Sequence, residues 1–235
     1  MVQQPSTPSI TTSKAKELTK EELAENRKEN LIAIAVVILV LGAIAFFIWR
    51  AVTAVPPVSE RVNVPFGNAP SLGSEIAPVD IVIFSDFECP YCGDFARYTF
   101  PDVKTTLIDT GKARIAYRYF PLPTHTYAYG AAQAAACADA QGKFWEYHDI
   151  LYAHQDALAI EHLQSYAREL GLDQTLFDQC LREEERASTV LADRALGLDL
   201  GVAGTPTFFL NGRKIAGSLT VQEFTAEVEA ELAAS

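Results

Sequence analysis

The chain has 235 residues, of which 49% are hydrophobic, and its formal net charge is −11 at pH 7. This length and composition allow one sizeable globular core with further segments outside it. The acidic balance, without any cluster of lysine and arginine, argues against a nucleic-acid partner.

An uncharged apolar run, LIAIAVVILVLGAIAFFIW, occupies residues 31–49. As a helix it would extend roughly 28 Å, close to the ~30 Å hydrocarbon thickness of a bilayer. We therefore expect a transmembrane anchor at residues 31–49, in contact with the lipid bilayer, rather than a buried core helix, which would carry a polar stripe. The basic residues that precede the run are Lys14, Lys16, Lys20, Arg27 and Lys28.

Because these basic residues all precede the apolar run, we expect a cytoplasmic polar tail at residues 1–30 and an extracytoplasmic position for everything after Arg50. A cleaved signal peptide is the alternative, because Val52-Thr53-Ala54 resembles a cleavage site. The apolar run, however, exceeds the usual signal-peptide length of about 7–15 residues, and a long polar segment precedes it. The expected location is therefore the cell (inner) membrane, single-pass, with the main domain on the periplasmic or extracytoplasmic side.

Residues 50–78 are rich in proline, glycine and serine, which predicts a linker that contains one short strand at residues 61–64. The following VDIVIFS indicates a buried strand. DFARYTFPDVKTTLIDTG has apolar residues at helical spacing and ends at Gly111, and RIAYRYFPL indicates a second strand. The order is β-α-β.

Residues 126–200 have a helical pattern throughout, with Asp173 as one expected N-cap. Two strands, TPTFFL and RKIAG, then flank an Asn211-Gly212 hairpin signal, and Thr220 with Glu223 forms a capping box for a last helix. This order predicts an α/β class fold. We therefore expect a thioredoxin fold at residues 79–125 and 201–235, with an inserted α-helical domain at residues 126–200.

Two cysteines, Cys89 and Cys92, lie at the first strand-to-helix turn, in FSDFECPYC. Pro90 suits the first helical position, which leaves Cys89 near a helix N-terminus where unpaired N–H groups stabilise a thiolate. Cys92 lies one turn further along the same face and can close a disulfide with Cys89. We expect both to be catalytic, as a redox-active disulfide that needs no cofactor.

Other uses of the cysteines remain alternatives. A metal site would need more ligands, and Cys137 and Cys180 are isolated from one another in the sequence, so no metal is expected. An inert structural disulfide between Cys89 and Cys92 is the second alternative. For Cys137 and Cys180 we expect a structural disulfide, since exported cysteines tend to pair, with two buried free thiols as the alternative.

Three segments, FSDFECPYC, QGKFWEYHD and GTPTFFLNG, together resemble the DsbA-like thiol:disulfide oxidoreductases, especially membrane-anchored bacterial ones. The resemblance covers about residues 68–235. It implies that Pro206 is a cis proline facing the Cys89 sulfur and that Thr205 offers backbone groups to a bound substrate strand. Phe87 and Tyr91, which flank the motif, are expected to form an apolar rim that holds unfolded substrate.

The sequence departs from the family at two positions. Tyr91 stands where the more oxidising members have a histidine between the cysteines. Ile83 stands six residues before Cys89, where many thioredoxin-fold enzymes carry a buried carboxylate for proton transfer. Asp86 and Glu88 lie nearer in the sequence, which leaves their distance from the sulfurs open.

The expected function is introduction of disulfides into reduced or unfolded exported proteins, with a membrane redox partner that reoxidises Cys89 and Cys92. We expect the chain to act as a monomer. The alternatives are a disulfide reductase or isomerase on the same fold and a non-enzymatic tethered binding module. Isomerases of this type usually dimerise through an added N-terminal domain, for which the segment between Arg50 and Asp80 is too short, so the oxidase is favoured.

Overall fold

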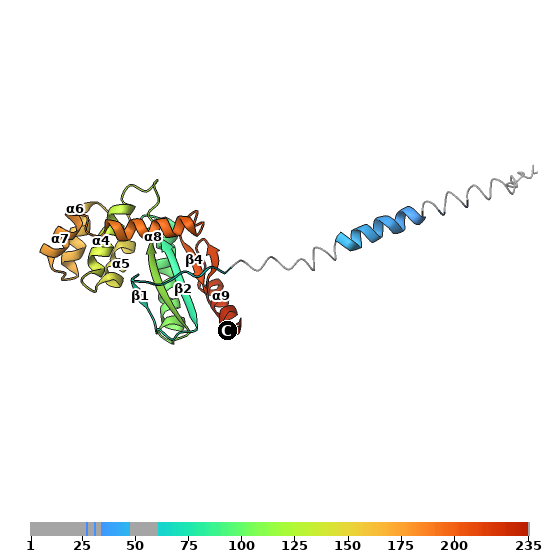
Figure 1. Ribbon diagram of the computed structural model, residues 1–235, viewed down its shortest axis with the longest axis horizontal. Helices are drawn as coiled ribbons and strands as arrows, with labels where there is room; N and C mark the ends of the chain where they lie inside the picture. Colours follow the sequence, from blue (N-terminus) through green and yellow to red (C-terminus); the bar gives the residue numbers. More distant parts are fainter. Residues whose placement is uncertain (1–26, 28–30, 32–33, 48–60, 235) are drawn as a thin grey trace, which may run out of the picture. The chain divides into compact units, whose positions relative to one another are not determined.

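The computed structural model describes residues 27, 31, 34–47 and 61–234 (Figure 1). The chain divides into two compact units, Met1–Val58 and Ser59–Ser235. In the first unit, residues 34–47 are helical and their side chains are exposed. Within the described residues, no helix is long and apolar enough to cross a membrane. The expected anchor at residues 31–49 lies partly outside the described residues, and the expected tail at residues 1–30 lies outside them except for Arg27.

A five-stranded mixed sheet forms the centre of the second unit, in the order β1-β3-β2-β4-β5. β2 and β3 are parallel, and the other neighbours are antiparallel. The strands are β1 Ser71–Leu72, β2 Val79–Ser85, β3 Ala113–Tyr119, β4 Thr207–Leu210 and β5 Arg213–Ala216. Because helices cover both faces, β2 is apolar and buried at nearly every position.

A helical segment connects the parallel strands β2 and β3, as the β-α-β pattern predicted. It consists of α2 Pro90–Asp94, η1 Phe95–Thr99, α3 Phe100–Val103 and η2 Lys104–Ile108, of which η1 and η2 are π-helical turns. Pro101 has no N–H to give to the preceding turn, and the wider turns flank it. Gly111 ends the segment with φ +76°, a conformation that glycine adopts without steric cost.

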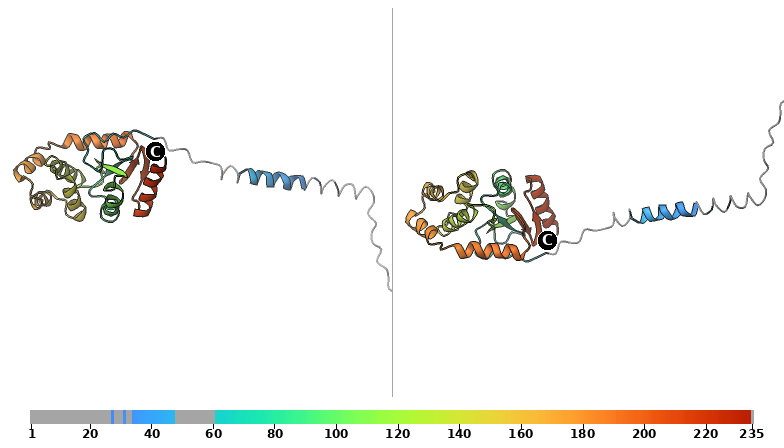
Figure 2. Two further views of the ribbon diagram at one scale, coloured as in Figure 1. Left: turned by 90° about the horizontal axis from the view of Figure 1, so that it is seen from below. Right: turned by 90° about the horizontal axis from the view of Figure 1, so that it is seen from above.

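Helices α4 to α7 gather at one end of the sheet, and α8 runs back along it beside β3 (Figures 1 and 2). A final helix, α9, packs on α3, β2 and β4. The bounds are α4 Ala128–Asp139, α5 Phe144–Ala153, α6 Ile160–Glu169, α7 Gln174–Arg182, α8 Ala187–Asp199 and α9 Val221–Ala234.

The inserted helices and the sheet share one hydrophobic core. Tyr117 of β3 packs on Phe144 and His148 of α5, with ring centroids 5.1 and 5.6 Å apart. Phe87, which follows β2, stacks on Tyr117 at 5.2 Å. The active-site turn is therefore packed directly against the insertion.

Three of the predicted local signals are confirmed. Asp173 caps α7 by accepting a hydrogen bond from the Leu176 amide at 3.0 Å. Thr220 and Glu223 form the reciprocal capping box before α9. Asn211 and Gly212 both have positive φ in the β4–β5 turn.

The predicted short strand at residues 61–64 is wrong. These residues form no strand; Val62 donates one hydrogen bond to the Gly212 carbonyl at 3.0 Å. Pro65 follows at once and cannot donate to a ladder. The strand of this region is instead β1, which lies inside the segment predicted as linker.

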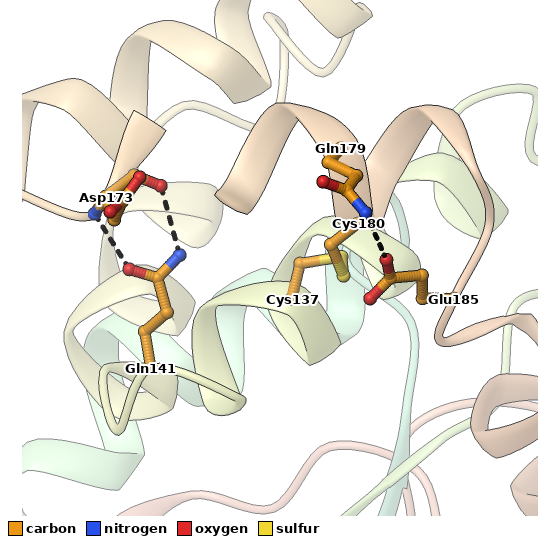
Figure 3. Close-up of a disulfide and its surroundings, with 6 residues drawn as sticks. All are labelled: Cys137, Gln141, Asp173, Gln179, Cys180 and Glu185. Atoms are coloured by element: carbon orange, nitrogen blue, oxygen red, sulfur yellow. Dashed lines mark hydrogen bonds between the residues drawn. A yellow bond between two sulfur atoms is a disulfide. The ribbon is translucent and has the colours of Figure 1, made fainter. Parts of the chain in front are cut away.

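A disulfide joins Cys137 of α4 to Cys180 of α7, with the sulfur atoms 2.00 Å apart (Figure 3). Two hydrogen bonds join Gln141, just after α4, to the backbone of Asp173, the N-cap of α7. The two cysteines are 43 positions apart, so the bond closes a long loop of the unfolded chain. The bond therefore links two helices of the insertion that are distant in the sequence.

A variant with Cys137→Ala and Cys180→Ala should therefore be less stable by up to ~4 kcal/mol, the chain-entropy value for a loop of this length. Urea unfolding of the variant beside the unchanged protein measures the loss. Alkylation of the denatured, unreduced protein supplies the control and should leave both cysteines unlabelled. An unchanged unfolding midpoint, or label on either residue, would contradict a stabilising disulfide.

Candidate functional site

The end of β2 positions the two cysteines of the motif. Cys89 is the N-cap of α2, with extended backbone angles, and Pro90 is the first helical residue. The Gly93 amide donates to the Cys89 carbonyl at 3.1 Å, which fixes the first turn. Both cysteines are free thiols; Cys89 is 4% exposed and Cys92 is 1% exposed. Cys89 thus lies at the open start of the helix, with Cys92 beneath it.

The two thiols differ strongly in acidity. A hydrogen bond from the Cys92 thiol is the main cause that lowers the pKa of Cys89 to about 6, against the opposing effect of burial. The backbone amides of Cys92 and Tyr91 lower it further. Burial, followed by the neighbouring Cys89, raises the pKa of Cys92 well above its ordinary value. At neutral pH Cys89 is therefore the thiolate and Cys92 the protonated partner.

The loop before β4 closes the other side of Cys89. The Thr205–Pro206 peptide bond is cis, as the resemblance implies. The Cys89 sulfur lies 3.3 Å from the Thr205 carbonyl oxygen. Thr205 is 9% exposed, so its backbone lies next to the sulfur at the edge of the buried region. The structure thus brings Cys89, Cys92, Thr205 and Pro206 together from two distant parts of the chain.

The two aromatic residues expected to form a substrate rim differ in position. Tyr91 is 65% exposed beside Cys92 and is available for contact. The expectation for Phe87 is wrong: it is 1% exposed and packs against Tyr117, Tyr152 and His148. Its place in the motif suggested a surface position, but the turn after β2 directs its ring into the core shared with α5.

Two carboxylates near the motif hold the loop that leads into the insertion. The buried Asp86 accepts hydrogen bonds from the Leu122 and Glu88 amides and pairs with His125 at 2.8 Å. Glu88 accepts from the Tyr127 amide at 2.6 Å. Neither side chain is among the groups that set the pKa of either cysteine. Their role is positional.

A glutamine that the sequence analysis missed clamps the active-site turn from the insertion. The Gln155 side-chain amide donates to the carbonyls of Phe87 and Cys89 at 2.8 and 3.0 Å. Arg97 donates to the other end of Gln155 at 2.9 Å and to the Tyr152 carbonyl. Any Cβ at Gly93 would lie 1.9 Å from the Gln155 oxygen, so glycine is required for this clamp. No local sequence pattern marks such a contact.

The described residues include no group of three or more histidine, cysteine, aspartate or glutamate side chains placed to hold a metal ion. The arrangement can carry out thiol–disulfide exchange, because a stabilised thiolate and a second thiol lie in contact.

The pKa of Cys89 makes a testable prediction. In the reduced protein, the rate of Cys89 alkylation by iodoacetamide should rise roughly tenfold between pH 5 and pH 7 and then level off, because the thiolate is the reactive form. Cys92 should react far more slowly over the same range. Stopped samples analysed by peptide mass spectrometry give both rates; faster labelling of Cys92, or a Cys89 midpoint near pH 8.5, would contradict the assignment.

Comparison with known proteins places the chain in a family. A family model described as Thioredoxin matches residues 67–230. Among curated proteins, the chain is 40% identical over 164 residues to a Na(+)/H(+) antiporter NhaA 3 of Salinispora tropica and 42% identical over 163 residues to an NhaA 1 of Salinispora arenicola. These matches cover 69% and 68% of this chain but 24% of each antiporter. The chain thus spans about a quarter of the length of these relatives.

Solved structures give a closer match in length. BdbD from Bacillus subtilis is 26% identical, with 74% of this chain and 97% of that chain covered and a TM-score of 0.67. Alpha-DsbA1 of Wolbachia pipientis is 26% identical, with 72% of this chain and 94% of that chain covered and a TM-score of 0.64. A thioredoxin-like oxidoreductase of Silicibacter pomeroyi is 29% identical, with 72% of this chain and 95% of that chain covered and a TM-score of 0.63. The chain belongs to the thioredoxin family, among its DsbA-like thiol-disulfide oxidoreductases.

Proposed function

We propose that this protein is a thiol-disulfide oxidase that transfers the Cys89–Cys92 disulfide to reduced or unfolded exported proteins. The observation that carries the proposal is the pair of free thiols at the start of α2, Cys89 at the N-cap and Cys92 buried one turn further on, in which the pKa of Cys89 is lowered to about 6. A thiolate exists only in the reduced protein, so whatever stabilises it favours the reduced form over the disulfide. This stabilisation is complete above the ordinary thiol pKa of 9.0, decreases as the pH falls and is lost below about pH 6, so part of it acts at neutral pH.

The proposed reaction has two exchanges. A substrate thiolate attacks the Cys89 sulfur, a bond forms between them, and the Cys89–Cys92 bond breaks with its electron pair on Cys92. A second substrate thiolate then attacks the substrate sulfur of the mixed disulfide and expels Cys89 as a thiolate. Two electrons pass to the protein; Cys92 takes up one proton, and the other is released to solvent.

The surroundings of Cys89 support binding of an extended substrate segment. Thr205 presents backbone groups beside the sulfur, and the exposed Tyr91 ring offers an apolar contact. We propose that the substrate lies between them. Reoxidation then requires a membrane redox partner that accepts two electrons from the dithiol, and the chain acts as a monomer.

A reductase or isomerase on the same residues is the second candidate. A Cys89 pKa of about 6 lies nearer to the ≈ 7 of thioredoxin than to the ≈ 3.5 of DsbA. Tyr91, unlike a histidine between the cysteines, adds no positive charge. Ion transport is not proposed, because the antiporter relatives match over only 24% of their length.

The oxidase proposal predicts the behaviour of two variants. The oxidised protein should form disulfides in reduced ribonuclease, and Cys89→Ser should abolish this transfer because the attacked sulfur is gone. Cys92→Ser, incubated with ribonuclease that already carries disulfides, should accumulate ribonuclease bound to Cys89: the Cys89 thiolate attacks a substrate disulfide and expels a substrate thiolate, and no Cys92 thiol remains to resolve the mixed disulfide. Non-reducing gels and ribonuclease activity measure both. Transfer that survives Cys89→Ser, or efficient insulin reduction without ribonuclease oxidation, would contradict the oxidase.

We also propose that residues 31–49 anchor the protein in the cell membrane, with the catalytic domain extracytoplasmic. The support is the uncharged run and the five basic residues that precede it, at positions 14, 16, 20, 27 and 28. This placement would bring the dithiol near both exported substrates and a membrane partner.

A pair of reporter fusions tests this placement. Alkaline phosphatase joined after Ser235 should be active, because the enzyme needs an extracytoplasmic position to form its own disulfides. The matched fusion after Asn30 should be inactive. A well-expressed but inactive fusion at Ser235, or activity at Asn30, would show that the orientation is wrong.

A further inference from the structure

A cluster of three buried hydroxyl groups lies behind Cys92. Ser85 is the last residue of β2, Tyr117 belongs to β3 and Tyr152 to α5. The Ser85 and Tyr152 oxygens are 2.8 Å apart, and the Tyr152 and Tyr117 oxygens are 3.0 Å apart. All three residues are 3% exposed or less. The Ser85 side chain is one of the hydrogen-bonding groups that lower the pKa of the Cys92 thiol, against the larger opposing effect of burial.

These hydroxyls can form one directed chain of donors. Burial raises the pKa of Tyr117 and Tyr152 well above the ordinary value, so both stay neutral and act only through hydrogen bonds. If Tyr117 donates to Tyr152, and Tyr152 donates to Ser85 at 2.8 Å rather than to the Asp86 carbonyl at 3.4 Å, the Ser85 proton remains for the Cys92 sulfur. Cys92 in turn donates to the Cys89 thiolate. In such a chain each bond polarises the next.

The chemistry of disulfide transfer supplies a reason for this arrangement. When a thiolate attacks Cys89, the electron pair of the broken bond goes to Cys92, which is 1% exposed. A buried, unsolvated thiolate is a poor leaving group unless a donor meets it. Ile83 occupies the position of the family's buried carboxylate, and the Asp86 carboxylate is turned to Leu122 and His125.

We propose that Ser85, supported by Tyr152 and Tyr117, is the positioning residue that stabilises Cys92 as the leaving thiolate when the disulfide is attacked. The proposal deepens the proposed function and rests on it. The bond that forms joins the attacking sulfur to Cys89, and the bond that breaks is Cys89–Cys92. The developing charge on Cys92 receives the Ser85 hydrogen bond before a proton from the solvent or substrate neutralises it.

The test is single-turnover attack of a small monothiol, cysteamine, on the isolated oxidised protein. This step does not depend on whether the protein is an oxidase or a reductase in the cell, so failure here is distinct from failure of the proposed function. Ser85→Ala should slow the attack roughly five- to tenfold, from the loss of one hydrogen bond to a charged group. Ser85→Thr, which keeps a hydroxyl, should restore most of the rate.

Two measurements separate this role from a structural one. Alkylation of Cys89 in the reduced Ser85→Ala protein should stay within about twofold of the unchanged rate, because the Cys92 donor remains. Thr99→Val removes a different buried hydroxyl, which bonds to the Leu219 carbonyl at 2.9 Å, and should leave the attack rate unchanged.

If Ser85→Ala does not fold, Tyr152→Phe replaces it as the test variant, because it keeps the shape of the core. Tyr152→Phe should slow the attack roughly two- to threefold, because Ser85 loses its hydrogen-bond donor. The proposal is overturned if the oxygen-deleting variants Ser85→Ala and Tyr152→Phe react like the unchanged protein. It is also overturned if Thr99→Val slows the attack equally, or if Cys89 alkylation falls in parallel.

Discussion

The hydrogen bond between the thiol of Cys92 and the sulfur of Cys89 is the interaction on which the chemistry of the site depends. It is the largest cause of the low pKa of Cys89, and it requires that Cys92 keep its proton. Burial ensures this, because charge on Cys92 would have to form with almost no access to water. One cysteine is thus acidic because the other is not.

The surrounding fold maintains this difference in acidity between the two cysteines. The end of β2 and the start of α2 set the two sulfurs one turn apart. Gln155 holds the turn from the insertion side, and the Thr205 carbonyl meets Cys89 from the β4 side. Phe87 packs on Tyr117 and Tyr152 in the core shared with the insertion, and Cys92 is buried in the same core. The insertion is therefore part of the redox centre rather than an addition to it.

Local signals explain which parts of this arrangement could be predicted from the sequence. The β-α-β order, the cap at Asp173, the capping box at Thr220 and the Asn211-Gly212 turn each depend on residues close together in the chain. The position of Cys89 at a helix start follows from Pro90 in the same way.

Long-range contacts explain what could not be predicted. The Ser85–Tyr152 bond joins residues 67 positions apart, and the Gln155–Phe87 bond joins residues 68 apart. The periodic pattern of apolar residues in a sequence does not predict contacts between residues this far apart. Phe87 was misplaced for the same reason, since its partners Tyr117 and Tyr152 come from another strand and from the insertion.

The reduction potential of the Cys89–Cys92 couple tests the central claim most directly, because thiolate stabilisation must favour the reduced form. It can be measured by equilibrating the unit Ser59–Ser235, with its other disulfide intact, in glutathione buffers at pH 7. The account predicts a value less negative than about −200 mV, on the oxidising side of the glutaredoxins and toward the ≈ −120 mV of DsbA. A value of about −200 mV or below, toward the ≈ −270 mV of thioredoxin, would contradict it.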